Sequence, residues 1–250
     1  VGNGNVTASL GGRFSNNATI YEEDETGDQV KSDSSNVTSS ELTVDLTTEE
    51  RTTNSATLNV TAATAATLNE ASAMTIKTDV GTVELDSTAL KKVSNTQNEV
   101  SITVTKNSTE SETNVAASYT VEVKSNGTDL LPDGGSGNGT ITLTLPVPAE
   151  SKDTTLYVWY AVEQGDSVMY VDRVATYSSG TDVTFTVGHL SRYDLLSSEP
   201  NANETAVASI TRNGQTTYYD SLQAAVDAVT DNTQTTIKLL KTIEGNGVKV

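Results

Sequence analysis

His189 is the first residue to consider for catalysis. The chain has one histidine and no cysteine, so any catalytic triad would have to use this residue. Ser191 and Asp194 follow closely, which raises the possibility of a Ser-His-Asp triad. In a strand, however, His189, Ser191 and Tyr193 share a face on which neighbouring side chains are about 6–7 Å apart. That spacing is too long for a triad hydrogen bond, and no Gly-x-Ser-x-Gly turn is present. We therefore expect His189 to be structural and the chain to have no catalytic residue.

Metal binding has one candidate, an acidic run formed by Glu22, Glu23, Asp24, Glu25 and Asp28. Calcium needs six to eight oxygen ligands held by a fixed loop, and the run lacks the Asp-x-Asp-x-Asp-Gly spacing that provides them. We expect a solvated loop there, with a weak calcium site as the alternative. One histidine and no cysteine exclude a multi-histidine or thiolate zinc centre, so no metal or cofactor is expected.

A glycine-rich stretch, with Gly134, Gly135, Gly137 and Gly139, has the composition of a phosphate-binding loop. Such a loop must lead into a helix, whereas residues 140–145 alternate in the manner of a strand. The stretch is therefore predicted to be a flexible hairpin loop without a nucleotide.

Aromatic residues gather around one predicted hairpin, where Tyr157, Trp159, Tyr160, Tyr170 and Tyr177 lie within 21 residues. Exposed aromatic rings on a sheet can bind sugars, and buried ones fill a core equally well. Core packing is the expected role, and a ligand-binding face is the alternative.

The composition restricts the partners. The 33 acidic residues against 15 basic ones give a net charge of −18, which repels nucleic acid and anionic lipid. No stretch reaches the roughly 18 apolar residues of a membrane span. A chain rich in threonine, acidic and free of cysteine is typical of an extracellular β protein, although the missing cysteine does not by itself fix the compartment.

The elements that must position these residues are mostly strands, because apolar residues recur at every second position. Expected strands cover residues 6–10, 18–21, 41–46, 74–78, 82–85, 102–104, 118–123, 140–145, 156–162, 168–174 and 181–187. Two short helices are expected at 62–71 and at 88–93, the second capped by Ser87. The strand at 156–162 is apolar on both faces, which indicates a central strand covered on both sides.

The pattern changes after a polar linker at residues 199–204. Strands are predicted at 206–211 and 215–219, joined by an Asn213-Gly214 turn, and again at 235–240. Between them Asp220 is expected to cap a helix that runs to Val229 and has a buried stripe formed by Leu222, Ala225, Val226 and Val229. Residues 1–54 are expected to add strands to a β-sandwich at 55–198, and residues 205–250 to form a ββαβ unit.

Three stretches resemble modules of large exported surface proteins of Gram-positive bacteria, especially gut Firmicutes. LNEASAMTIKTDVGTVELDSTALKKV (68–93) and the segment 145–196, which ends in the phrase His189-x-Ser191-x-Tyr193, resemble a β-sandwich module. QTTYYDSLQAAVDAVTDNTQTTIKLLKTIEGNGVKV (215–250) resembles the capping helix and first strand of a right-handed parallel β-helix.

This resemblance implies a mainly β fold: an antiparallel sandwich with two short helices, followed by a β-helix cap whose later coils are missing. It implies a non-enzymatic module of a secreted or cell-surface protein, adhesin-like or acting in display or wall scaffolding. The alternative is an accessory, carbohydrate-binding module of a β-helix polysaccharide-active enzyme. Expected partners are a glycan or host protein and a second copy bound through the 235–240 edge strand.

Proteins of that kind sometimes carry Lys–Asn isopeptide cross-links beside a buried acid. Lys77, Lys92 and Lys124 lie in or beside expected elements and are the candidate donors, although the sequence alone does not bring three residues together.

Overall fold

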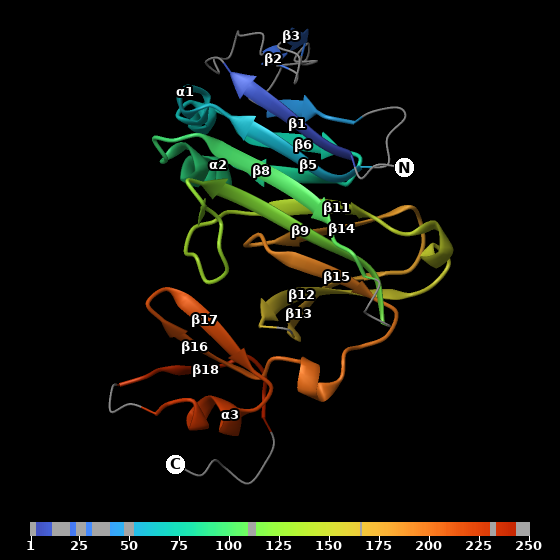
Figure 1. The fold of residues 1–250 in the computed structure, drawn as a ribbon, viewed down its shortest axis with the longest axis vertical. Coiled ribbons are helices and arrows are strands. Elements are labelled where there is room, and N and C mark those ends of the chain that lie inside the picture. The colour runs from blue at the N-terminus through green and yellow to red at the C-terminus, as the bar shows by residue number, and fades with distance from the viewer. Residues whose placement is uncertain are drawn as a thin grey trace.

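A computed structural model describes residues 4–11, 21–23, 29–31, 41–47, 53–109, 114–165, 167–230 and 234–243. The chain is mainly β, as expected from its period-2 pattern, with three short α-helices and several 3₁₀ turns. Its strands form three sheets (Figure 1).

The largest sheet, sheet A, has the strand order β13-β12-β15-β9-β8-β5-β1-β2-β3, and β10 pairs with β9. Its strands are β1 (Gly4–Gly11), β2 (Tyr21–Glu23), β3 (Gln29–Lys31), β5 (Thr53–Val60), β8 (Val100–Lys106), β9 (Val115–Ser125), β10 (Thr128–Asp129), β12 (Leu156–Gln164), β13 (Ser167–Tyr177) and β15 (Arg192–Leu196).

The second sheet, sheet B, has the order β14-β11-β7-β6-β4. Its strands are β4 (Glu41–Asp45), β6 (Ala73–Thr78), β7 (Gly81–Asp86), β11 (Ile141–Pro146) and β14 (Asp182–Val187). One face of each strand is buried: along β11, for example, Ile141, Leu143 and Leu145 are buried between half-exposed threonines.

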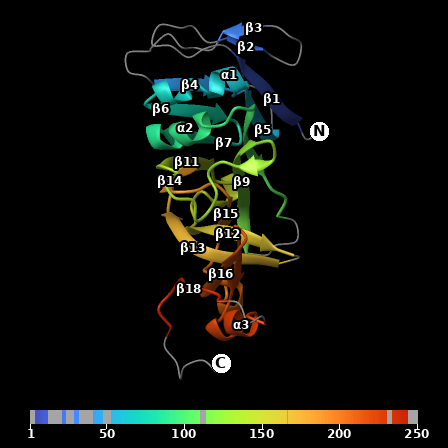
Figure 2. The same ribbon diagram turned by 90° about the vertical axis from the view of Figure 1, so that its left-hand side faces the viewer.

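The two sheets face each other across one core. Figure 2 shows β4, β6, β11 and β14 on one side and β1, β5 and β9 on the other. Buried side chains from both sheets, including Leu58, Ile76, Val121 and Leu143, belong to the same cluster. Burial of apolar surface at about 25 cal/mol per Å² is what holds the two layers together.

The fold differs from the expected antiparallel arrangement at two strand pairs. β1 runs parallel to β5, and β4 runs parallel to β6. Between β1 and β5 the chain passes through β4 in sheet B, and between β4 and β6 it passes through β5 in sheet A. Two parallel neighbours need a crossover connection, because the chain must travel back before the second strand can run in the same direction as the first. Here each crossover includes a strand of the other sheet.

Helices α1 (Ala62–Ala65) and α2 (Ser87–Ser94) lie at one end of the two sheets (Figure 1). Both short helices were expected, but residues 62–71 divide into α1 and a 3₁₀ turn at Leu68–Glu70. The cap of α2 also differs: Asp86, and not Ser87, accepts the amides of Thr88 and Ala89, at 3.0 and 2.8 Å. A carboxylate is a good N-cap because it also favours the positive end of the helix dipole.

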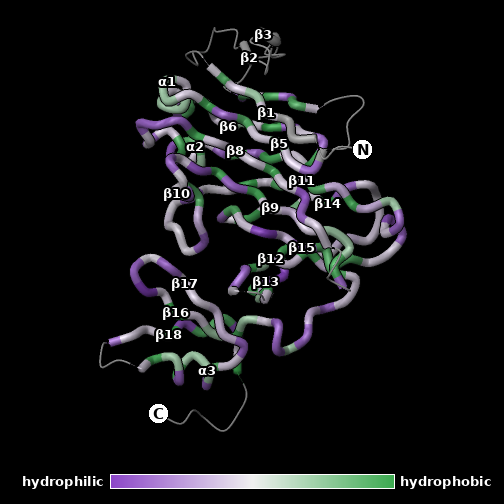
Figure 3. The backbone as a smooth tube through the Cα atoms, viewed as in Figure 1, coloured by the Kyte–Doolittle hydropathy of each residue, from purple (hydrophilic) through white to green (hydrophobic). Residues whose placement is uncertain are grey.

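The strand predictions agree closely with the described strands, apart from their ends. The prediction that β12 is covered on both faces is confirmed. Val158 and Tyr160 on one face belong to the main core, and Trp159 and Ala161 on the other face belong to a second buried cluster. β5 and β15 were missed, although Ala56, Leu58 and Val60 alternate in β5. The tube in Figure 3 shows apolar and polar residues alternating along such strands. The expected strand at 18–21 falls largely outside the described residues.

A C-terminal unit, residues 205–243, contains sheet C, of order β17-β16-β18, and helix α3 (Leu222–Asp227). Its strands are β16 (Ala208–Arg212), β17 (Gln215–Tyr219) and β18 (Ile237–Leu239). The β16–β17 turn is the expected Asn213-Gly214 turn, with φ of 52° and 81°.

Helix α3 is shorter than expected, and its cap is Ser221 in place of Asp220. Ala225 is completely buried against Ala208 and Ile210, with Val229 packed beside them. Leu222 and Val226, which were expected in the same buried stripe, remain half-exposed. A core of so few fully buried side chains is small, so contacts with the two large sheets matter for the stability of the unit.

Candidate functional site

His189 lies between β14 and β15, and it does not form a triad. Asp194, which would have been the acid of such a triad, is completely buried and binds Arg192 with both carboxylate oxygens, at 2.9 and 3.0 Å. Arg192 also reaches Glu163, at 3.0 Å. Asp194 therefore balances a buried guanidinium, which is a structural role.

The phrase His189-x-Ser191-x-Tyr193 has a structural explanation. The Tyr193 hydroxyl donates a hydrogen bond of 2.7 Å to the carbonyl oxygen of His189, four residues earlier. The Tyr193 ring is completely buried and packs against Phe185 and His189, with centroids 5.4 and 6.4 Å away. This tyrosine fixes the bend between β14 and β15 in the way that a tyrosine corner fixes a strand connection.

The aromatic residues of the β12–β13 hairpin are mostly core. Trp159, Tyr160, Tyr170 and Tyr177 are buried, and Tyr157 is half-exposed. Trp159 donates to Glu199 at 3.1 Å, which ties the linker to the outer face of sheet A. The exposed platform of rings that a sugar-binding sheet would need is not formed by these residues.

The glycine-rich loop is held in place more firmly than a flexible loop would be. Asn138 is buried, and its amide donates to the carbonyls of Pro132 and Gly188 at 2.8 and 2.9 Å. A side chain at Gly139 would collide with Asp86, and the φ of +79° is also one that glycine favours. The loop thus carries Asp133 on a fixed support.

Among the isopeptide candidates, Lys92 lies beside an asparagine. Its amine donates to the side-chain oxygen of Asn138, at 2.8 Å. Within the described residues neither partner hydrogen-bonds to a carboxylate, so the arrangement is an ordinary hydrogen bond. The acidic run of residues 22–28 lies outside the described side chains.

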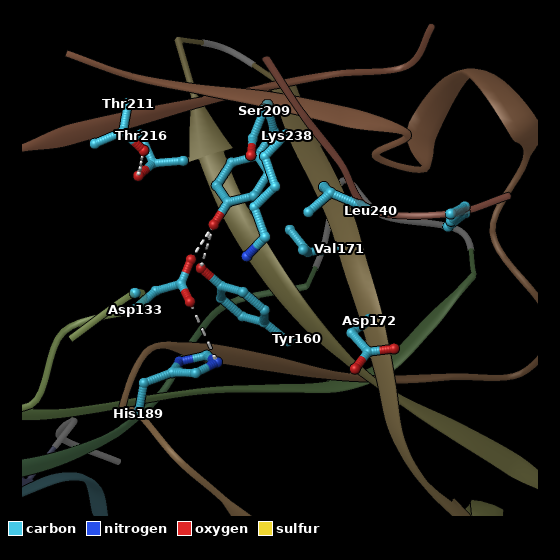
Figure 4. Close-up of a pocket in the computed structure, with 13 residues that line it drawn as sticks. Asp133, Tyr160, Val171, Asp172, His189, Ser209, Thr211, Thr216, Lys238 and Leu240 are labelled. Atoms are coloured by element: carbon cyan, nitrogen blue, oxygen red, sulfur yellow. Dashed lines mark hydrogen bonds and ion pairs between the residues drawn. The ribbon is translucent and has the colours of Figure 1, made fainter. Parts of the chain in front are cut away.

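The candidate site is a cavity of about 310 Å³ between sheet A, with its neighbouring loops, and the C-terminal unit (Figure 4). Asp133, Tyr160, Val171, Asp172 and His189 line it from the side of the large sheets. The volume lies at the lower end of the roughly 300–1,000 Å³ range of small-molecule sites.

The opposite wall comes from the C-terminal unit. It includes Ser209, Thr216 and Tyr218 from β16 and β17, and Lys238 and Leu240 from β18 and the residue that follows it. Sequence reasoning missed this site, because its residues come from segments up to about a hundred positions apart and share no local spacing.

A chain of polar contacts crosses the cavity (Figure 4). The Tyr218 hydroxyl donates to the carboxylate of Asp133, and the Tyr160 and Tyr218 hydroxyl oxygens are 3.4 Å apart. Because the proton of Tyr218 is directed at Asp133, Tyr160 is the donor in that second contact. His189 Nε2 lies 3.9 Å from the other Asp133 oxygen.

The electrostatics follow from burial. Desolvation by burial, with a hydrogen bond to Tyr218 and the charge of Asp133 adding to it, raises the pKa of Tyr160 far above its ordinary value. Desolvation lowers the pKa of His189, although Asp133 and Asp172 oppose that effect. The tyrosines therefore stay protonated, and the imidazole is neutral at pH 7.

One imidazole nitrogen has no partner in the described part of the chain: His189 Nδ1 is buried and makes no hydrogen bond there. A buried polar atom without a partner costs about 1–3 kcal/mol. Such atoms are rare in native proteins, and this one adds to the cost of keeping His189 buried.

No group of three or more acidic or histidine side chains in the described ranges lies close enough to hold a metal ion. Among the helices of those same ranges, none is long and apolar enough to cross a membrane. Neither the models of known protein families, nor the curated proteins, nor the solved structures gave a match to this chain.

Proposed function

We propose that the chain is a non-catalytic module of an exported cell-surface protein that acts in adhesion, display or wall scaffolding. In this proposal the two large sheets are a β-sandwich module, and residues 205–250 are the cap of a β-helix. The observation that supports it best is the attachment of the C-terminal unit. Ala206 donates a backbone hydrogen bond of 2.7 Å to Tyr170, and Tyr218 is held by Gln164 and by Asp133.

A scaffold must keep its modules in a fixed relation, and these contacts do so through both backbone and buried side chains. The composition agrees, since a net charge of −18 keeps such a protein soluble and poorly adherent to polyanions.

Surface location can be tested on the source cells. Intact cells are treated briefly with trypsin, and the released peptides are identified by mass spectrometry beside a cytosolic marker protein. The proposal expects peptides of this chain in the released fraction, without peptides of the marker. Recovery of the chain only after lysis would contradict it.

The edge of sheet C supports a second part of the proposal, a homodimer. β18 is an edge strand of that sheet, and Leu239 on it is 51% exposed. Exposed apolar edge strands pair readily with another chain. Light scattering should give a dimer mass that falls to a monomer mass in Leu239→Lys, whereas Gln215→Lys on the opposite edge strand should leave it unchanged.

One observation favours a second function, carbohydrate binding. The cavity is lined by hydroxyl, carboxylate and amine groups, which is the chemistry that recognises a small polar ligand. A glycan array probed with the purified chain tests this function: saturable binding to a defined sugar supports it, and a blank array argues against it.

A further inference from the structure

We propose that the cavity between sheet A and the C-terminal unit binds one neutral sugar unit, either a monosaccharide or the end of a glycan chain. This inference rests on the second of the proposed functions, carbohydrate binding, and assigns it to a place and to a ligand class.

The polar lining fits a ligand that has many hydroxyl groups. Asp133 and Asp172 can accept hydrogen bonds from sugar hydroxyls, while Ser209 and Thr216 can both donate and accept. Asp133 is already oriented by Tyr218, so its carboxylate is positioned before a ligand arrives. Preorganised groups of this kind lose little entropy on binding.

Val171 and Leu240 supply the apolar part of the same cavity. They lie near each other at one side of the cavity in Figure 4, away from Asp133. A sugar ring has an apolar C–H face as well as polar edges. A cavity that is apolar on one side and polar on another can contact both.

The charges favour a neutral sugar over an acidic one. Two carboxylates, Asp133 and Asp172, are matched by two amines, Lys238 and Lys241. The imidazole of His189 adds no charge at pH 7, because burial lowers its pKa. The cavity thus has no net charge, and the overall charge of −18 repels an anion approaching the protein.

Volume sets the size of the ligand. About 310 Å³ is little space for a drug-sized molecule but suits one sugar ring with a few waters.

The cavity exists only while the C-terminal unit is docked, because its two walls come from the two parts of the chain. A ligand that binds this closed form and not the open one stabilises the docking by mass action. Sugar binding and protection of residues 199–206 from proteases should therefore rise together.

The experiment is a titration of the full chain with glucose, galactose, mannose and N-acetylglucosamine, followed by protein NMR, with galacturonic acid as the acidic comparison. Thr216→Trp fills the cavity from β17, and Asp172→Ala removes an exposed carboxylate from its wall. Their matched controls are Thr217→Trp, on the opposite face of β17, and Asp153→Ala, on an exposed loop. Unchanged spectra outside the substituted region show that each variant is folded.

We expect saturable shifts with at least one neutral sugar, weakened roughly tenfold or more in Thr216→Trp and Asp172→Ala and unchanged in both controls. Sugar binding that persists in both cavity variants would overturn this inference and leave carbohydrate binding in place elsewhere on the chain. Binding of galacturonic acid alone would overturn the neutral ligand class. No binding to any of the five sugars, together with a blank glycan array, would overturn the inference and the carbohydrate-binding function together.

Discussion

The side chain of Gln164 pairs with the backbone of Tyr218 as a neighbouring strand would. Its amide oxygen accepts the Tyr218 N–H at 2.7 Å, and its amide nitrogen donates to the Tyr218 carbonyl at 3.0 Å. β17 is an edge strand of sheet C, so these two backbone groups find their partner in the large sheet A. One side chain at the end of β12 thus extends the hydrogen bonding of the C-terminal unit across the boundary.

Replacing Gln164 by leucine should loosen the C-terminal unit without unfolding the two large sheets. Two hydrogen bonds are lost and a half-buried peptide group loses its partners, which costs roughly 1–3 kcal/mol of docking free energy. Limited proteolysis should cut between residues 197 and 207 faster in this variant. Gln215→Leu, at an exposed position of β17, is the matched control and should be cut at the wild-type rate.

Tyr193→Phe tests the corner between β14 and β15. The change removes one buried hydrogen bond to the His189 carbonyl and keeps the ring, so the free energy of unfolding should fall by about 0.5–1.5 kcal/mol. Urea denaturation measures it, and Tyr219→Phe, on a partly buried tyrosine of β17, should change stability much less. Equal effects of the two substitutions would contradict the role given to Tyr193.

The Arg192–Asp194 pair should be costly to break from one side. Asp194→Ala removes a bidentate carboxylate partner from a buried guanidinium, and breaking a buried pair in this way typically costs about 3–5 kcal/mol. Glu163→Ala removes the exposed partner of the same arginine and should cost below about 1 kcal/mol. A small effect of Asp194→Ala in urea denaturation would mean that this pair is solvated.

His189 should make stability depend on pH below neutrality. Burial lowers its pKa in the folded chain below the unfolded value of about 6.5, so the unfolded chain binds its proton first as the pH falls. The wild type should therefore lose stability from about pH 6.5 down to the folded pKa, and be unaffected by this group above it. His189→Gln should remove that part of the dependence, and the one histidine allows a direct NMR titration.

A folded pKa at or above 6.5 in that NMR titration would show that the charge of Asp133 outweighs burial. Identical pH dependence of wild type and His189→Gln would instead show that the effects of burial and of the nearby carboxylates on the His189 pKa cancel.

Most strands could be predicted from the sequence because one face of the strand is buried. One-sided burial places an apolar residue at every second position, and this alternation is visible in the sequence. It was less accurate at helix ends, since Asp86 and Ser87, or Asp220 and Ser221, are adjacent residues that both make good caps. The parallel strand pairs were missed because they arise where the chain crosses to the other sheet between the two strands. No local sequence pattern encodes such a crossing.

The cavity was beyond sequence reasoning for a related reason. Asp133 directly precedes the glycine-rich loop, and Tyr218 lies in a predicted strand. Only tertiary packing brings the two residues together. Strand spacing predicted that His189 and Ser191 would not form a triad, but the position of His189 beside Asp133 could not be derived from spacing.

The most direct test of the docked arrangement is the hydrogen exchange of one amide, that of Tyr218. Its N–H points to Gln164 from an edge strand, so it is protected only while the C-terminal unit is attached to the large sheets. We expect slow exchange in the wild type, similar to that of the Ala206 amide bound to Tyr170, and fast exchange in Gln164→Leu. A Tyr218 amide that exchanges at the rate of an unfolded peptide in the wild type would contradict the docked unit and the cavity that depends on it.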